Sequence, residues 1–184
     1  MQDKVEILLL TGPAGVGKST LGWEIGAQLS AAGEAHAIIE SDELDRVYPK
    51  PAIDDLNRLK AGTLDVSSIN LAALWSTYRA LGHWRLVMSG VMLHLEFDRR
   101  WILAAIPAAR ITVIRLSATE ATLRARIAER EKGSGAEDQL RRTLRQAQRM
   151  AQEKADGLIV VPVDGQSPPE LARLVLRQAG WLAD

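Results

Sequence analysis

One eight-residue segment constrains the fold of this chain more than any other. It matches the pattern G-x-x-x-x-G-K-[ST] in full and consists of Gly12, Pro13, Ala14, Gly15, Val16, Gly17, Lys18 and Ser19. An apolar run at residues 5–10 precedes it, and a helical pattern at residues 18–31 follows. Glycines let successive backbone N–H groups turn inward, and the helix N-terminus adds its positive dipole end. The segment therefore predicts a phosphate-binding loop between a strand and a helix.

The side chains at the end of this loop suit a nucleotide with a metal ion. Lys18 can reach the β- and γ-phosphates, and the Ser19 hydroxyl can bind Mg²⁺. Thr20 can donate a further hydrogen bond to a phosphate. We therefore expect ATP and Mg²⁺ as cofactors.

Strand and helix patterns alternate along the rest of the chain. Strands are predicted at residues 5–10, 35–40, 85–88, 110–116 and 158–163. Helices are predicted at residues 18–31, 42–47, about 68–81 after a Ser67 or Ser68 cap, 98–106, 118–131, 136–156 and 168–180. Residues 52–65 have no clear period and are predicted to be rich in loops, with a helical turn around Leu56 and Leu59. This alternation predicts an α/β fold, a five-stranded parallel sheet sandwiched by helices, in one domain over residues 1–184.

The composition excludes several classes of protein. Lys and Arg total 23, as do Asp and Glu, so the net charge of zero disfavours nucleic-acid and polybasic membrane-surface proteins. The absence of cysteine excludes disulfides, thiolate catalysis and cysteine zinc sites. No targeting signal or membrane-spanning apolar stretch is recognised, so a cytoplasmic protein is expected. The oligomeric state, monomer or homodimer, stays open.

With this loop and this order of elements, the chain resembles the small P-loop kinases, namely shikimate, gluconate and adenylylsulfate kinases and chloramphenicol phosphotransferase. The resemblance covers nearly the whole chain in element order and length, and its specific motif is residues 12–19. It implies a P-loop NTPase fold of the nucleoside-monophosphate-kinase type with a nucleotide over the loop. It also implies an acceptor-binding segment, here residues 41–80, and a small lid, here residues 130–140.

Acidic residues gather at residues 40–45, where the second predicted strand ends. Ligands of open α/β sheets bind at the carboxyl ends of the strands. In the similar kinases an aspartate here lies beside the metal and the acceptor hydroxyl, which implies both roles for Asp42. The alternative is that these acids only complement a helix N-terminus. Asp45 and Arg46 are further candidates for contact with the acceptor.

Arginines and a loop near the predicted lid complete the expected nucleotide site. In the similar kinases one arginine near the hinge stacks on adenine and another stabilises the transferred charge, which implies these roles for Arg126 and Arg130. A loop after the last strand also passes over the adenine, which here corresponds to Asp164 and Gly165. The alternative for that loop is a turn followed by an N-cap at Ser167.

The third predicted strand departs from the common pattern. Many P-loop enzymes place an aspartate at its end to hold the water shell of the metal, but residues 89–91 (Ser-Gly-Val) contain no acid. The lysine and arginine that follow in gluconate kinases are not matched at residues 92–94 (Met-Leu-His), so gluconate is not indicated as the substrate. Trp75 and Tyr78 are candidates for walls of an acceptor pocket, with core packing as the alternative.

Together these features predict an ATP- and Mg²⁺-dependent phosphotransferase that acts on a hydroxyl of a small molecule, such as a metabolite, a sugar-like compound or an antibiotic. Lys18, Asp42 and Arg130 are its expected catalytic residues, and Ser19 and Asp42 its expected metal neighbours. Two alternatives stay open: a nucleoside or nucleotide kinase, and a nucleotide-binding switch or ATPase without a small-molecule acceptor.

Overall fold

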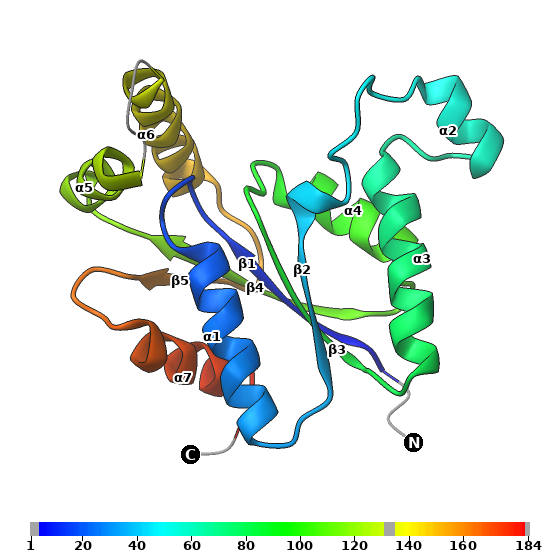
Figure 1. Cartoon of the computed structure of the whole chain (residues 1–184), viewed down its shortest axis with the longest axis horizontal. Helices are drawn as coiled ribbons and strands as arrows, with labels where there is room; N and C mark the ends of the chain where they lie inside the picture. The colour runs from blue at the N-terminus through cyan, green and yellow to red at the C-terminus, as the bar shows by residue number, and fades with distance from the viewer. Residues whose placement is uncertain (1–3, 131–134, 183–184) are drawn as a thin grey trace.

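Five strands form one parallel sheet with the order β2-β3-β1-β4-β5 (Figure 1). The computed structural model describes residues 4–130 and 135–182. The strands are β1 (Glu6–Thr11), β2 (His36–Glu40), β3 (Arg85–Gly90), β4 (Arg110–Ser117) and β5 (Leu158–Pro162). Because all five run in the same direction, their carboxyl ends meet at one edge of the sheet.

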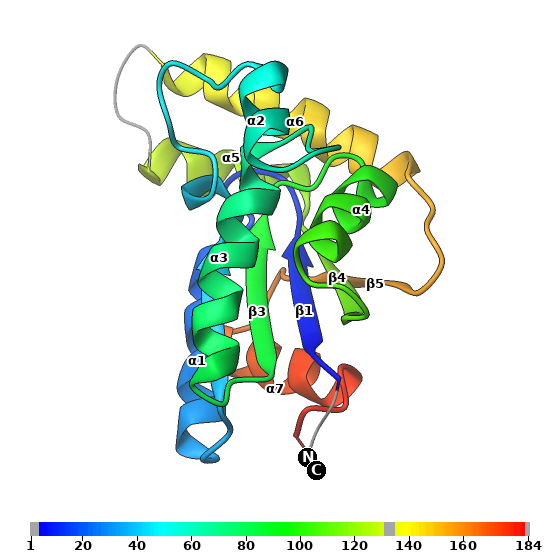
Figure 2. The ribbon, with the colours of Figure 1, turned by 90° about the vertical axis from the view of Figure 1, so that its right-hand side faces the viewer.

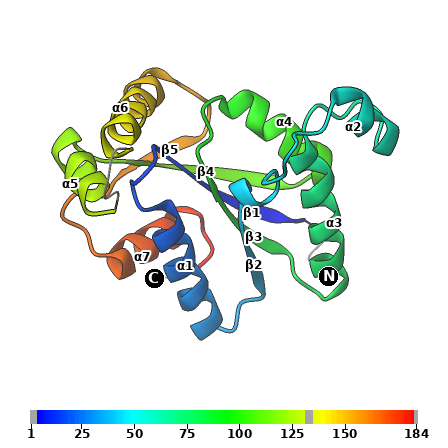
Figure 3. The ribbon, with the colours of Figure 1, turned by 45° about the horizontal axis from the view of Figure 1, so that its top comes forward.

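Helices cover both faces of the sheet. They are α1 (Lys18–Ala31), α2 (Ile53–Leu59), α3 (Val66–Ala80), α4 (Leu95–Ala105), α5 (Glu120–Arg130), α6 (Ala136–Gln152) and α7 (Pro168–Gln178), with a short 3₁₀ turn η1 (Ser41–Glu43). Helices α1 and α7 lie on one face, and α3 and α4 lie on the other (Figure 3). Helices α5 and α6 lie beside the loop between β1 and α1, at the carboxyl edge of the sheet (Figures 1 and 2).

The central strand β1 divides the core into two clusters. Its Leu8 and Leu10 pack on the α1 and α7 side, whereas Ile7 and Leu9 pack on the α3 and α4 side. Such alternation follows from the two-residue period of a strand, and burial on both faces explains the continuous apolar run. A strand buried on both faces thus leads directly into the glycine-rich loop.

The structure confirms the predicted α/β fold with its five-stranded parallel sheet. The predicted helix at residues 42–47 is wrong, because only the 3₁₀ turn at Ser41–Glu43 forms there. Residues 52–65 contain the short helix α2, and Asp65 rather than a serine caps α3, accepting a hydrogen bond from the backbone N of Ser67 at 2.7 Å. Asp65 has extended backbone angles, as N-cap residues do.

The predicted lid at residues 130–140 is only partly described, because residues 131–134 lie outside the described residues. Helix α5 ends at Arg130 and α6 begins at Ala136, so the two helices flank that segment. Across residues 4–130 and 135–182, none of the helices is both long and apolar enough to cross a lipid bilayer.

Candidate nucleotide and phosphoryl-transfer site

The glycine-rich loop joins the end of β1 to the first turn of α1, as the motif predicts. Gly15 has a φ of 75°, in the left-handed region that glycine adopts without strain. A Cβ atom at Gly15 would also lie 2.8 Å from Cδ1 of Ile127 on α5. Glycine at this position therefore allows both the turn and the close approach of α5 to the loop.

The ammonium group of Lys18 folds back over this loop. Its Nζ donates hydrogen bonds to the backbone oxygens of Gly12 at 3.1 Å and Pro13 at 2.9 Å. Burial lowers the pKa of Lys18 from 10.5 to about 8; the charges of Asp42 and Glu40 oppose this shift, and that of Arg130 adds to it. A bound polyphosphate would supply negative charge where the lysine has lost water.

Glu40, at the end of β2, brings a carboxylate to the loop. The Ser19 hydroxyl donates a hydrogen bond to its Oε2 at 3.1 Å, and Glu40 stands in register with Ser89 of β3. Strand β3 lacks the expected acid, and the neighbouring strand β2 supplies Glu40 at the same position in the register. The sequence placed Glu40 in the acidic segment at residues 40–45 but gave it no role in the site.

Gly90 explains how β2 and β3 come together at this edge. A Cβ atom at Gly90 would collide with the Ser41 hydroxyl, which comes from the turn after β2. Ser41 is the residue before Asp42, so a larger residue at position 90 would have to displace the side chain that precedes Asp42. The glycine at the end of β3 therefore allows the close approach of the turn that carries Asp42.

A cavity of about 480 Å³ lies over the loop and collects most of the predicted catalytic residues. Asp42 and Arg46 line it from the turn after β2, and Arg130 lines it from the end of α5. The other lining residues are Ala14, Gly15, Gly17, Lys18, Ser19, Thr20, Glu40, Ser89, Gly90, Val91, Arg126 and Gln139. Carboxylates, cations and residues of the glycine-rich loop share one concave space, as transfer of a charged group requires.

Arg126 lines both this cavity and a second one of about 210 Å³ beside it. Its Nη1 donates a hydrogen bond to the backbone oxygen of Val16 at 2.6 Å, which ties α5 to the loop. Residues after β5 close the second cavity, and they are Val163, Gln166, Pro168 and Leu171. A partly apolar space next to a phosphate loop has the character that a nucleobase needs.

Asp164 and Gly165, which the sequence suggested for the adenine side, do not line these two cavities. The Asp164 carboxylate instead accepts hydrogen bonds from the Thr119 and Thr122 hydroxyls, at 2.8 and 2.6 Å. These bonds lower the pKa of Asp164, with the Thr122 bond as the largest cause. Ser167 makes a capping box with Glu170 at the start of α7, which was the alternative for this loop.

Helix α6 contributes two glutamines that sequence reasoning missed. Gln139 lines the cavity over the loop, and Gln146 accepts a hydrogen bond from the backbone N of Ala14 at 3.0 Å. They are seven residues apart, which is two helical turns, and Thr143 between them is fully buried. This spacing is the signal that could have identified the face of α6 that contacts the loop.

The remaining acceptor candidates lie in different surroundings. Asp45 forms an exposed ion pair with Lys50 at 2.7 Å. Trp75 is 5% exposed and belongs to the core cluster on the α3 and α4 side, with Tyr78 packed against that cluster. The structure thus gives Trp75 the surroundings of a core residue.

Residues that could hold Mg²⁺ are few. In the described part of the chain, no group of three or more histidines or acids is arranged to bind a metal ion. Mg²⁺ commonly keeps several waters and is held by one or two protein oxygens together with substrate phosphates. The oxygens of Ser19 and Glu40, beside Lys18 in one cavity, have the chemistry that such an ion accepts.

Several solved structures share this fold. A gluconokinase from Sinorhizobium meliloti aligns with a TM-score of 0.58 and 21% identity over 95% of this chain and 91% of its own. The Deinococcus radiodurans tunicamycin resistance protein aligns with a TM-score of 0.57 and 18% identity, over 97% of this chain and 98% of its own. Shikimate kinase from Acinetobacter baumannii aligns with a TM-score of 0.53 and 16% identity, over 96% of this chain and 93% of its own. At these identities the likeness concerns the fold, that of the small P-loop kinases.

Comparison of the sequence with curated proteins gave no significant match. A family model described as an AAA domain matches residues 8–150, well over half of the chain. The match begins within β1, includes the glycine-rich loop, Glu40, Asp42 and helix α5, and ends within α6. The chain therefore belongs to this family of P-loop AAA domains.

Proposed function

We propose that this protein transfers the γ-phosphoryl group of ATP to a hydroxyl group of a small molecule. The observation that carries the proposal is the single cavity lined by Lys18, Ser19, Glu40, Asp42 and Arg130. Donors for the phosphates, a carboxylate for the hydroxyl and a cation for the transferred group thus face one space. Phosphoryl transfer depends mainly on such positioning and on charge stabilisation.

In this proposal the glycine-rich loop binds the nucleotide. Its backbone N–H groups and Lys18 hold the phosphates, and Arg126 with the residues after β5 encloses the base. Ser19 and Glu40 hold the magnesium ion, which neutralises phosphate charge when bound. Glu40 thereby takes the part that an aspartate after the third strand has in many P-loop enzymes.

Asp42 acts as the base for the acceptor. The hydroxyl proton moves to its carboxylate as the hydroxyl oxygen bonds to the γ-phosphorus, and the bond from that phosphorus to the ADP oxygen breaks. Arg130 and Lys18 stabilise the charge on the transferred group. Their guanidinium and ammonium groups come from different elements that line the cavity, the end of α5 and the start of α1.

The similar structures support an acceptor of small size. Two of them are named for gluconate and shikimate, which are small hydroxylated acids, and a third for resistance to tunicamycin. The sequence after β3 disfavours gluconate itself, because Met92, Leu93 and His94 do not match the lysine and arginine that follow in gluconate kinases. We therefore extend to this chain the reaction class and not the substrate.

The Asp42→Asn variant tests the proposal. A coupled assay of ADP release against sugars, polyols, nucleosides and hydroxylated antibiotics would first identify an acceptor. We then expect a rate about 10² to 10⁴ times lower in Asp42→Asn, with ATP affinity nearly unchanged. Asp45→Asn is the matched control, because Asp45 pairs with Lys50 at the surface. Unchanged turnover in Asp42→Asn would contradict its role, and ATP binding without any acceptor-dependent ADP release would favour a nucleotide-dependent switch.

A further inference from the structure

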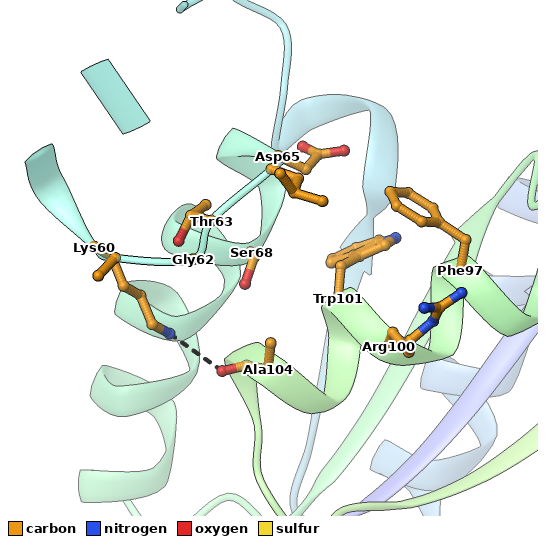
Figure 4. Close-up of a pocket in the computed structure, with 11 residues that line it drawn as sticks. Lys60, Gly62, Thr63, Asp65, Ser68, Phe97, Arg100, Trp101 and Ala104 are labelled. Carbon is orange, nitrogen blue, oxygen red and sulfur yellow. Dashed lines mark hydrogen bonds between the residues drawn. The ribbon is translucent and has the colours of Figure 1, made fainter. Parts of the chain in front are cut away.

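A third space, besides the two cavities at the phosphate loop, lies on the α3 and α4 side of the molecule. It is a cavity of about 280 Å³ between the α2–α3 connection and α4 (Figure 4). Its lining residues are Lys60, Ala61, Gly62, Thr63, Leu64, Asp65, Ser68, Phe97, Arg100, Trp101 and Ala104. Residues 60–68 belong to the segment that the sequence suggests for acceptor binding.

Large apolar side chains form the walls of this cavity. Phe97 and Trp101 come from one face of α4, and both line the cavity (Figure 4). Leu64 faces the cavity from the α2–α3 connection; it is 66% exposed, and Phe97 is 42% exposed. Exposed large apolar side chains gathered around a concavity mark a binding site more often than a structural surface.

Two hydroxyl groups lie in the same cavity. Thr63 and Ser68 line it, although only 6% and 5% of their surfaces are exposed. Within the described ranges neither side-chain hydroxyl has a hydrogen-bond partner in the protein. Neither oxygen is among the fully enclosed, unpaired side-chain atoms of the described residues, so both are open to the cavity and available to a ligand with polar atoms.

Two cations stand at the rim of the cavity. Lys60 donates a hydrogen bond to the backbone oxygen of Ala104 at 3.2 Å, and Arg100 forms an exposed 3.5 Å ion pair with Glu96. Both side chains are flexible and near water, so they can turn toward a polar substituent or lie over a ring.

Core residues connect this cavity to the phosphate site. Trp101 belongs to the same core cluster as Leu44 and Met92. Leu44 comes two residues after Asp42, and Met92 directly follows Val91; Asp42 and Val91 both line the cavity over the loop. Core side chains of one cluster thus lie behind both spaces, next in sequence to residues that line the cavity over the loop.

The α2–α3 connection, which forms one wall of this cavity, and helix α2 before it are weakly packed. Helix α2 has seven residues, of which only Leu56 is buried, while Ile53 and Leu59 are 56% and 74% exposed. The connection that carries Thr63 and Leu64 is therefore held by few apolar contacts. Such weakly packed segments adjust to an occupant more readily than core elements do.

We propose that the acceptor is a two-part molecule, in which an aromatic ring system is joined to a hydroxylated part. The ring lies in the cavity between Leu64, Phe97 and Trp101, and polar atoms at its edge bond to Thr63 and Ser68. The hydroxylated part extends to Asp42. This inference rests on the proposed function and names the substrate class for the same site.

Matched pairs of compounds test the proposal. One pair is 4-nitrophenyl glucoside and methyl glucoside, and the other is adenosine and ribose, so the members of each pair differ by the ring. Binding is measured by calorimetry on the full chain with a non-hydrolysable ATP analogue present. We expect at least one aromatic member to bind tenfold or more tightly than its partner, because ring burial removes a large apolar area from water. Equal binding within both pairs, or no binding by either aromatic probe, would overturn the inference.

A variant pair locates the binding. Phe97→Ala should remove most of the advantage of the aromatic member and leave ATP affinity unchanged. Leu103→Ala is the matched control, because Leu103 is on the same helix, is 39% exposed and does not line the cavity. Equal effects of the two substitutions on aromatic binding would also overturn the inference.

Turnover separates the two proposals. ADP release with ribose or methyl glucoside that is insensitive to Phe97→Ala would retain the kinase function and reject the two-part acceptor. Binding of an aromatic probe that depends on Phe97, without ADP release from any acceptor, would retain the ring site and reject the kinase function.

Discussion

Replacing Glu153 by alanine would leave the Arg115 guanidinium buried without its counter-charge. Arg115 is on β4 with a side chain 4% exposed, and its Nη2 lies 2.5 Å from Oε2 of Glu153. Its Nη1 also donates to the backbone oxygen of Met150 at 2.7 Å, and the other oxygen of Glu153 accepts from the backbone N of Leu95 at 3.0 Å. One carboxylate thus joins the end of α6, the sheet and the start of α4.

The expected loss of stability follows from this geometry. Removing one partner of a buried ion pair costs about 3–5 kcal/mol, because the other charge keeps its desolvation penalty. The Glu153 side chain is 24% exposed, so water can reach the vacated site and the lower end applies, about 3 kcal/mol. For a domain of this size that loss lowers Tm by roughly 6–12 °C.

Urea unfolding followed by tryptophan fluorescence would measure the change, with thermal unfolding as a second readout. Glu96→Ala is the control, since Glu96 pairs with Arg100 at 3.5 Å with both side chains largely exposed, and should change stability by under about 0.5 kcal/mol. The double variant Arg115→Met with Glu153→Leu should recover most of the loss, because no charge is left buried. A loss of stability under about 1 kcal/mol in Glu153→Ala, or equal losses in Glu153→Ala and Glu96→Ala, would refute this reasoning.

Three further predictions concern the nucleotide site. ADP affinity should fall about tenfold per pH unit above about 8, because Lys18 loses its proton in the free protein but keeps it when phosphates are bound. Calorimetric titrations should show this fall, and Lys18→Arg should abolish it. A fall that begins only near pH 10.5 would contradict the lowered pKa of Lys18. Gly15→Ala should weaken ATP binding at least tenfold in equilibrium dialysis, because the new methyl group would collide with Ile127 and the φ of 75° strains an alanine. Gly82→Ala is the control: its φ is 92°, but the space around it is open, so it should affect stability alone. Ser19→Ala should raise the Mg²⁺ concentration needed for half-maximal ATP binding while metal-free affinity stays the same, and an unchanged Mg²⁺ requirement would count against its role.

Much of the fold was predictable because its signals are local. The helix predicted at residues 18–31 matches α1 at both ends, since a glycine-rich turn precedes it and its apolar residues recur every four positions. The strands were also recognisable, because burial on both faces leaves short, nearly continuous apolar runs. The order of elements then led to a parallel sheet.

The segment after β2 was less predictable. The acids at residues 42–45 are compatible with a helix start, but tertiary contacts hold a 3₁₀ turn there, with Leu44 buried and its backbone oxygen bonded to Asn70. Helix α2 gave no clear period, because only Leu56 is buried and a single apolar contact leaves no repeating face. Local propensity is weakest where few side chains pack.

The sequence by itself determined the phosphate loop, since all of its ligating groups lie within residues 12–20 and the backbone needs only local turns to present them. Only the tertiary structure decided what faces that loop. Sheet order places β2 two strands from β1, and register sets Glu40 beside Ser89, so that a carboxylate reaches Ser19 from 21 residues away in the chain. Gln146 reaches Ala14 across 132 residues because α6 packs beside the loop. Such contacts depend on how whole elements pack, and packing sums many weak interactions that no local pattern records.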